Sequence, residues 1–339
     1  MRHTRAALEL LAPAVLVVAV ALFGTLVSAS TETYVITTLV NVAIVVALYV
    51  FIGNSGVLSF GHISFVAVGA WTAGILSMPR SEKPAIMPNL AGFLRDTTVG
   101  NVPSLALAAA VGAVFALIVG LPLMRLSGLA AGIATFGVLE ITHNVLRYWE
   151  KIGPGLNTFS AVPETTGLLQ AAVGALIAIA VAFLYQRSRY GRMLRATRED
   201  AAAARAVGVS VYGQRLLAFA LSGALAALAG GLYVHLLPVN AEELYLDLTF
   251  ITLAMLVIGG VTSLWGAVVV SAVDSFLAEA ENGVHVLGGT LDFPAGTRIV
   301  VVGALMAFVL IVRPSGLTGG RELPLPKALV RSLLTKFSA

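Results

Sequence analysis

Long apolar runs alternate with short polar stretches along most of the chain. A helix that crosses a membrane needs about 20 mostly apolar residues, and ten runs reach or approach that length. They cover residues 10–29, 34–53, 61–79, 104–124, 128–147, 168–186, 215–236, 246–262, 266–282 and 297–313. The pattern therefore predicts an all-α polytopic membrane protein with about ten transmembrane helices.

Composition supports this fold class. Hydrophobic residues make up 58% of the 339 positions and charged residues only 11%, whereas soluble domains carry about 25% charged residues. Cysteine is absent, which excludes disulfide and thiolate chemistry. The first 30 residues resemble a signal peptide, but their apolar run is longer than the about 7–15 residues typical of one, so we expect an uncleaved first helix.

The distribution of charge predicts an orientation. Of the 21 Lys and Arg residues, 14 lie in residues 1–10, 187–215 and 313–339, whereas the loop 237–247 carries three acids and no base. Cytoplasmic loops are enriched in Lys and Arg, so the basic segments are expected inside and the acidic loop outside. Ten crossings then leave both termini in the cytoplasm. Orientation explains the basic residues, and we expect no nucleic-acid partner.

Two glycine-rich segments interrupt the apolar pattern, GNSGVLSFGH at 53–62 and GGVTSLWG at 259–266. Irregular backbone at membrane depth must be buried in protein or line a wet path, and such breaks in corresponding places point to a translocation path. We therefore predict two pseudo-related halves with Gly-rich breaks. The alternative is a pair of tight turns in which glycine supplies positive φ. The candidate path residues are Gly56, Ser59, Gly61, His62, Gly259, Gly260 and Ser263.

Polar residues inside the apolar runs add further candidates. Glu140, His143, Asn144 and Arg147 share one face of the fifth run, and polar stripes on spanning helices usually face a bundle interior or a wet cavity. Glu140 and His143 are therefore candidate path residues; the alternative is a wet helix end in which Glu140 bonds His143. Asp274 is isolated in the ninth run, and we expect it to pair with a neighbouring helix.

The basic segment 187–214 contains the pattern of a short helix. Thr197 is the expected N-cap, acids occupy the first turn, and an alanine run leads to a stop at Gly208. Short isolated helices are marginal in water, so docking on a partner would stabilise this one. The alternative is a solvated basic loop, which positive-inside topology alone would explain.

These segments together resemble the inner-membrane permeases of branched-chain amino acid ABC importers. The match at the first break is carried by Gly56, Leu58, Ser59, Gly61, His62, Gly69, Ala70, Trp71 and Thr72. The match to the family's ATPase-coupling loop is carried by Gly191, Arg192, Arg195, Arg198, Glu199 and Gly208. LAFALSGALAALAGGLY, GGVTSLWGAVVVSA and RPSGL resemble further family stretches, whereas residues 128–160 fit less well.

The resemblance implies a permease domain over 1–317, with the coupling loop at 187–214, and a cytoplasmic tail at 318–339. It implies a bacterial inner-membrane location, two ABC ATPase subunits, a second related permease and an extracytoplasmic solute-binding protein. The chain has no GxxxxGK[ST] motif, so ATP would be used by partner subunits. We expect no cofactor, metal or catalytic site here.

The resemblance further implies transport of branched-chain or other hydrophobic amino acids. Two alternatives stay open from the sequence. One is a permease for urea, short amides or another small solute. The other is an ion-coupled secondary transporter, in which Glu140 and Asp274 would serve as ion sites.

Overall fold

The computed structural model describes residues 2–25, 29–281, 284–286, 289–291, 294 and 296–320. Ten apolar helices correspond one to one with the ten predicted runs, which confirms an all-α polytopic membrane protein. They are α1 (Arg2–Gly24), α2 (Ala29–Ser55), α3 (His62–Ser77), α6 (Asn101–Leu123), α7 (Gly128–Tyr148), α8 (Leu168–Arg187), α11 (Val211–Val234), α12 (Leu246–Gly259), α13 (Leu264–Glu281) and α14 (Thr297–Val312). Five of them have the length and composition of full membrane spans, and five apolar helices are shorter.

Short elements occupy the connections between these helices. They are α4 (Lys83–Ile86), α5 (Gly92–Arg95), the 3-10 turn η1 (Glu150–Ile152), α9 (Arg189–Glu199) and α10 (Ala201–Ala206). Strands β1 (Val284–Val286) and β2 (Gly289–Leu291) form a small antiparallel hairpin, in which His285 pairs with Thr290.

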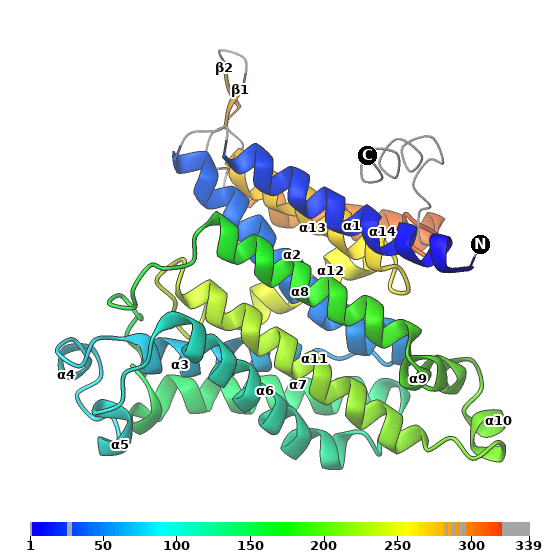
Figure 1. Cartoon of the computed structure of the whole chain (residues 1–339), viewed down its shortest axis with the longest axis horizontal. Helices are drawn as coiled ribbons and strands as arrows, with labels where there is room; N and C mark the ends of the chain where they lie inside the picture. Colours follow the sequence, from blue (N-terminus) through cyan, green and yellow to red (C-terminus); the bar gives the residue numbers. More distant parts are fainter. Residues whose placement is uncertain are drawn as a thin grey trace.

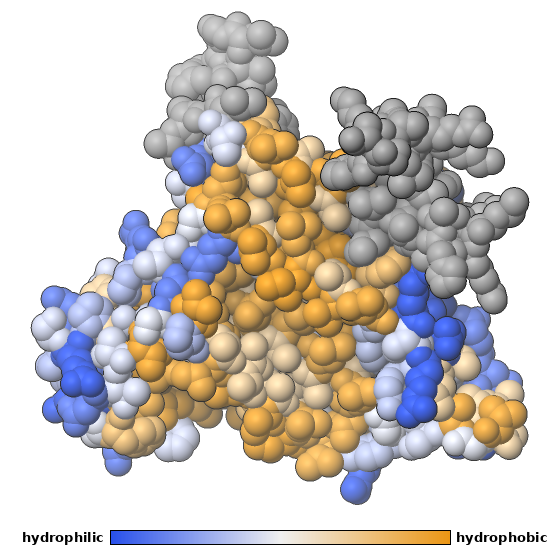
Figure 2. Space-filling view, viewed as in Figure 1, coloured by the Kyte–Doolittle hydropathy of each residue, from blue (hydrophilic) through white to orange (hydrophobic). Residues whose placement is uncertain are grey.

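The connections gather at two opposite ends of the bundle (Figure 1). At one end, the N–H of Ala91 beside α5 donates to the carbonyl oxygen of Lys151 in η1. At the other, Arg215 of α11 donates through Nη1 to the carbonyl oxygen of Leu126 in the α6–α7 connection. Figure 2 shows apolar surface over the middle of the bundle and polar surface near α4 and α9. Successive helices therefore alternate in direction, as the charge pattern requires; which end faces the cytoplasm stays a prediction.

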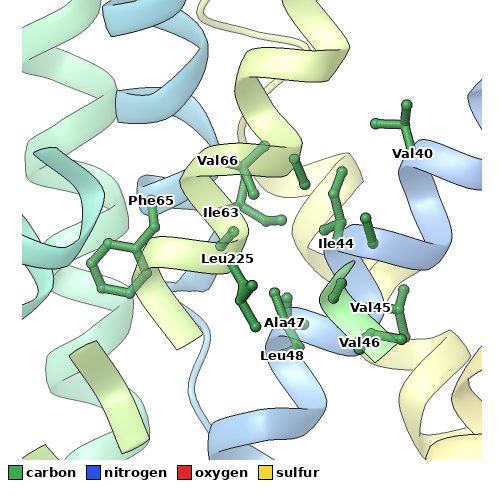
Figure 3. Close-up of a cluster of buried hydrophobic side chains, with 14 of the residues drawn as sticks. Val40, Ile44, Val45, Val46, Ala47, Leu48, Ile63, Phe65, Val66 and Leu225 are labelled. Atoms are coloured by element: carbon green, nitrogen blue, oxygen red, sulfur yellow. The ribbon is translucent and has the colours of Figure 1, made fainter. Parts of the chain in front are cut away.

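Helix α2 lies at the centre of the bundle. Of its most apolar 18-residue window, 94% is buried inside the protein. Figure 3 shows Val40, Ile44 and Leu48 of α2 in one apolar cluster with Val66 of α3 and Leu225 of α11. A helix that is apolar on all sides is expected in a core or in lipid, and here its neighbours are other helices.

Polar side chains fix the neighbours of α2 in register. Tyr49 donates its hydroxyl to Oε1 of Gln186 in α8 at 2.6 Å. Ser222 of α11 donates to the carbonyl oxygen of Ala47 at 2.6 Å. Such interhelical hydrogen bonds hold membrane helices together where the hydrophobic effect distinguishes poorly between protein and lipid.

Helices α3 and α11 cross in backbone contact because glycine removes the side chains between them. A Cβ atom on Gly69 would lie 2.0 Å from the carbonyl oxygen of Ala227, and one on Gly230 would lie 1.9 Å from that of Val66. Close approach through small residues is the usual packing mode of membrane helices. The α3–α11 pair therefore has little room to slide and forms a rigid frame behind the first break.

The alternation of connections generates a test of orientation. The chain has no cysteine, so single cysteines can be placed at two exposed positions, Val207 after α10 and Leu156 after α7. Positive-inside topology puts residue 207 in the cytoplasm and residue 156 outside. In intact cells, an impermeant maleimide is expected to label Leu156→Cys and spare Val207→Cys, with both labelled after lysis. The reverse pattern would invert the predicted topology.

Candidate transport and coupling site

The first glycine-rich break separates α2 from α3. Helix α2 ends at Ser55, Gly56 adopts a φ of +70°, and α3 begins at His62. The break satisfies its backbone inside the protein: the N–H of Val57 donates to Oγ of Ser55, and that of Phe60 donates to Oγ1 of Thr135 in α7, each at 3.1 Å. This is the condition under which non-helical chain is tolerated at membrane depth.

The coupling segment after α8 contains two helices, where the sequence pattern predicted one. Helix α9 begins after Ser188, whose Oγ accepts the N–H of Gly191, and runs through Thr197 to Glu199. The prediction of Thr197 as an N-cap is therefore wrong. Its Oγ1 instead donates back to the carbonyl oxygen of Leu194 at 2.7 Å, as a threonine inside a helix often does.

Asp200 is the residue that caps α10. Its Oδ1 accepts the N–H groups of Ala202 and Ala203 at 2.8 and 3.0 Å. These bonds, with that of Ala203 first, lower the pKa of the Asp200 carboxyl, because they favour its charged form. The helix ends before Gly208, which adopts a φ of +84° and so confirms the predicted stop.

Three of the predicted coupling residues hold α9 against the end of α8. A Cβ on Gly191 would lie 2.2 Å from the carbonyl oxygen of Tyr185. Arg195 donates to the carbonyl oxygen of Gln186 at 2.6 Å, and Arg192 to that of Arg187 at 3.1 Å. Arginines at a helix C-terminus satisfy carbonyl groups that have no partner within the helix.

Arg198 connects the coupling segment to the first break. Its Nη1 donates to the carbonyl oxygen of Gly53 at 2.7 Å. A Cβ on Gly56 would lie 2.5 Å from Cγ of Arg198, so the arginine stem lies directly on the break. Glu199 pairs with the same guanidinium at 2.8 Å and stays largely exposed. Local sequence patterns missed this contact because 145 positions separate its partners.

The break in turn lies against α7. A Cβ on Gly61 would lie 2.3 Å from the carbonyl oxygen of Thr135. Glycine is therefore required here by the closeness of a second backbone, and not by a positive φ, since φ at Gly61 is −93°. Residues of the coupling segment, the break and α7 are thus in contiguous contact.

His62 and Ser59 are enclosed by protein. The His62 ring is fully buried, and its Nδ1 shares a 2.8 Å hydrogen bond with Oγ of Ser59. The ring stacks on Phe51 and meets the edge of Phe219, with centroids 5.5 and 5.4 Å away. Its Nε2 is buried without a hydrogen-bond partner. In this conformation the pair fixes the break and does not open onto solvent.

The polar stripe of α7 faces the loop between α11 and α12. The carboxylate of Glu140 accepts a hydrogen bond from Asn144 at 2.8 Å and another from the hydroxyl of Tyr245. The Glu140–His143 bond considered from the sequence is absent; His143 instead stacks on Tyr245 with centroids 3.9 Å apart. Sequence analysis missed Tyr245, since nothing local marks it as a partner of α7.

Charged and polar groups hold the stripe of α7 against the loop between α11 and α12. The hydrogen bond to the Glu140 carboxylate, followed by burial, raises the pKa of Tyr245 to about 12. Arg147 forms an ion pair with Glu242 of the same loop. Glu140 itself remains exposed on the surface of α7. A carboxylate on a spanning helix is costly to expose to lipid, so this face is suited to water or to another protein.

The second break is a tight turn between α12 and α13. Gly260 adopts a φ of +108°, and Oγ of Ser263 accepts the N–H of Gly266 at 3.1 Å. Thr318 donates to the carbonyl oxygen of Gly259 at 2.8 Å. These contacts account for the glycines and Ser263 as a capped turn, which favours the tight-turn alternative. Of the predicted tail 318–339, residues 321–339 lie outside the described residues.

The two breaks lie side by side. A Cβ on Gly53 would lie 2.7 Å from the carbonyl oxygen of Val261. Both breaks therefore occupy the same end of the bundle as α9.

Asp274 pairs with a neighbouring helix, as expected. Arg298 of α14 donates through Nε and Nη2 to the two carboxylate oxygens of Asp274, at 3.1 and 2.5 Å. A bidentate pair of this kind is a strong structural contact. Among the residues that the structure describes, no three His, Cys, Asp or Glu side chains gather as metal ligands would.

An apolar cavity of about 520 Å³ lies between α3, α6 and α7. Its lining includes Trp71, Phe115, Val138, Ile141 and Val145. The α7 residues that line it, among them Val138 and Ile141, lie on the face of the helix opposite to the Glu140 stripe, since one turn takes about 3.6 residues.

Comparison with known proteins points to membrane transport. Residues 30–310 match the family model described as "Branched-chain amino acid transport system / permease component". The chain is 28% identical to the high-affinity branched-chain amino acid transport system permease protein LivM of Salmonella typhimurium, over 83% of this chain and 68% of that protein. It is 27% identical to LivM of Escherichia coli, over 90% and 73% of the two chains.

Other relatives are named as permeases of a different import system. The chain is 27% identical to the autoinducer 2 import system permease protein LsrC of Salmonella paratyphi B, over 53% of each protein. No solved structure matches the chain significantly.

The contact between the first break and α7 generates a stability test. Gly61→Ala places a Cβ against the carbonyl oxygen of Thr135, so the backbones must separate. Overpacking of this kind costs typically about 1–3 kcal/mol, and we expect a clearly lower midpoint of thermal unfolding in detergent. Gly92→Ala is the control, because a Cβ there meets nothing within 4 Å. Equal midpoints for the two variants would contradict the close approach.

Proposed function

The chain belongs to the family of branched-chain amino acid transport system permease components, and from this premise we propose that it is the membrane-spanning subunit of an ATP-driven importer. It is a multi-pass membrane transport subunit, and five helices among its described residues are long and apolar enough to span a membrane. Our proposal places it in a bacterial inner membrane with both termini in the cytoplasm, consistent with its basic segments.

The contact between Arg198 and Gly53 carries this proposal. Helices α9 and α10 stand outside the bundle at the end that charge assigns to the cytoplasm (Figure 1). Arg198 joins them to the break between α2 and α3, with a 2.7 Å hydrogen bond to the Gly53 carbonyl oxygen. A partner that moves α9 would therefore act directly on the end of the central helix α2.

Energy would come from two ATPase subunits, because the chain has no phosphate-binding loop. We propose that they dock on α9 and α10, where Glu199 and much of α10 remain exposed. A second permease and an extracytoplasmic binding protein would complete the importer. The exposed Glu140 face of α7 is the surface we assign to the shared path, since it is unsuited to lipid.

The proposed solute is a branched-chain or other hydrophobic amino acid. The family description and the two LivM relatives support it. The LsrC relatives, named for autoinducer 2 import, favour a second candidate, another small solute.

Uptake into proteoliposomes tests the proposal. The chain would be reconstituted with its partner permease, ATPases and binding protein, with the nucleotide-binding face accessible. We expect labelled leucine uptake to require hydrolysable ATP and to be competed by valine and isoleucine but not by urea. A non-hydrolysable ATP analogue serves as the control.

Two results would contradict the proposal in different ways. Uptake driven by a sodium or proton gradient without ATP would make the chain a secondary transporter. ATP-dependent uptake of a polar solute, with no competition by leucine, would retain the importer and replace its solute.

A further inference from the structure

A basic cavity of about 680 Å³ lies at the same end of the bundle as α9 and α10. It is formed by the α6–α7 connection, α10 and the first turns of α11. Its lining includes Arg125, Ser127, Arg205, Tyr212 and Arg215. None of the described residues that line it is acidic, so the cavity gathers three guanidinium groups without a carboxylate in its wall.

These arginines retain hydrogen-bonding capacity. Arg125 is exposed, and its guanidinium carbon lies 6.0 Å from the centre of the Tyr212 ring. Arg215 donates through Nη1 to the carbonyl oxygen of Leu126 at 3.1 Å, but its Nε is buried without a hydrogen-bond partner. An oxyanion with several acceptor oxygens would use these donors.

The nearest acidic groups are already engaged elsewhere. The carboxylate of Asp200, the acid beside Arg205, accepts two backbone N–H groups at the start of α10. Glu199 pairs with Arg198. Asp200 also interacts electrostatically with Arg205, so it offsets part of one of the three positive charges. The cavity keeps a net positive charge.

Its surroundings place the cavity at a membrane surface. Tyr212 donates its hydroxyl to the carbonyl oxygen of Leu121 at 3.0 Å, and Arg215 binds that of Leu126. Both leucine side chains are exposed, at 51% and 38%. The cavity thus opens where spanning helices end and apolar side chains begin, and tyrosine is enriched at that depth.

We propose that this cavity binds the phosphate of an anionic phospholipid, with the acyl chains lying along the exposed apolar flank of α6 below it. Basic pockets between transmembrane helices on the cytoplasmic side suit anionic headgroups, and arginine matches phosphate through two parallel donors. The adjoining apolar surface favours a lipid over an acidic protein partner. Because the cavity joins α10 to the α6–α7 connection, a bound lipid would brace the coupling segment. The proposal does not depend on which solute is carried.

Native mass spectrometry of the delipidated full-length chain tests the proposal. Phosphatidylglycerol is titrated against phosphatidylcholine, whose phosphate is neutralised by its own choline, and against inorganic phosphate. Each basic residue near an anionic surface contributes about a fivefold gain, so Arg125→Gln/Arg205→Gln is expected to weaken phosphatidylglycerol binding roughly thirtyfold. Among the residues that the structure describes, neither arginine side chain forms a hydrogen bond that the substitution would break.

Arg80→Gln/Lys151→Gln is the matched control, because it removes two charges from exposed positions outside the cavity, at the opposite end of the bundle. We expect it to change binding by no more than about twofold. Equal losses in the two double variants, or no loss in the first, would overturn the proposal. It would also fail if phosphatidylcholine bound equally well, or if free phosphate bound as tightly as the lipid. It would fail likewise if phosphatidylglycerol did not bind and the two arginines were needed only for binding of a purified ATPase subunit.

Discussion

A single hydrogen bond from the coupling segment caps the C-terminal end of α2, the central helix of this protein. Arg198 reaches from the coupling segment to the carbonyl oxygen of Gly53, in the last turn of α2. The last carbonyl groups of a helix have no partner within it, and lipid supplies none. The guanidinium therefore satisfies a group that the bundle would otherwise leave exposed at a break. The same bond makes the position of α9 inseparable from the end of α2.

Two glycines connect the end of α2 to other parts of the bundle through close backbone contacts. Gly53 lies against Val261 in the second break, and Gly61 lies against Thr135 in α7. Where backbones touch there is no flexible side chain to absorb a displacement, and packed elements of this kind shift as units. A movement of the coupling segment would therefore reach α7, whose stripe binds the outer loop through Tyr245. In our account, this is how events at one end of the bundle affect the polar face at the other.

The sequence was most informative where the physics is local. Apolar runs of about 17 residues or more leave few alternatives to helices, and each predicted run contains one in the structure. Gly208 marked the end of α10 correctly, and the positive φ of Gly260 agrees with the tight-turn alternative for the second break. Asp274 was expected to pair with a neighbouring helix, because polar groups inside a membrane seek partners; only the structure identified Arg298 as that partner.

Contacts distant along the chain escaped prediction. Both Thr197 and Asp200 are good N-cap residues, and packing of α9 on α8 decided between them. The burial of α2 depends on helices that are distant along the chain. The hydrogen bonds of Arg198 and Tyr245 likewise join positions about 100 or more residues apart. No periodicity within one helix encodes such pairs.

The coupling of ATP hydrolysis to uptake in Arg198→Gln tests the central claim most directly. A hydrogen bond from a charged group contributes about 1.5–3 kcal/mol. We therefore expect the assembled variant to hydrolyse ATP at a rate close to that of the wild type while its uptake of labelled leucine per ATP falls at least about tenfold. An unchanged ratio of uptake to hydrolysis, in a variant that assembles normally, would contradict the account.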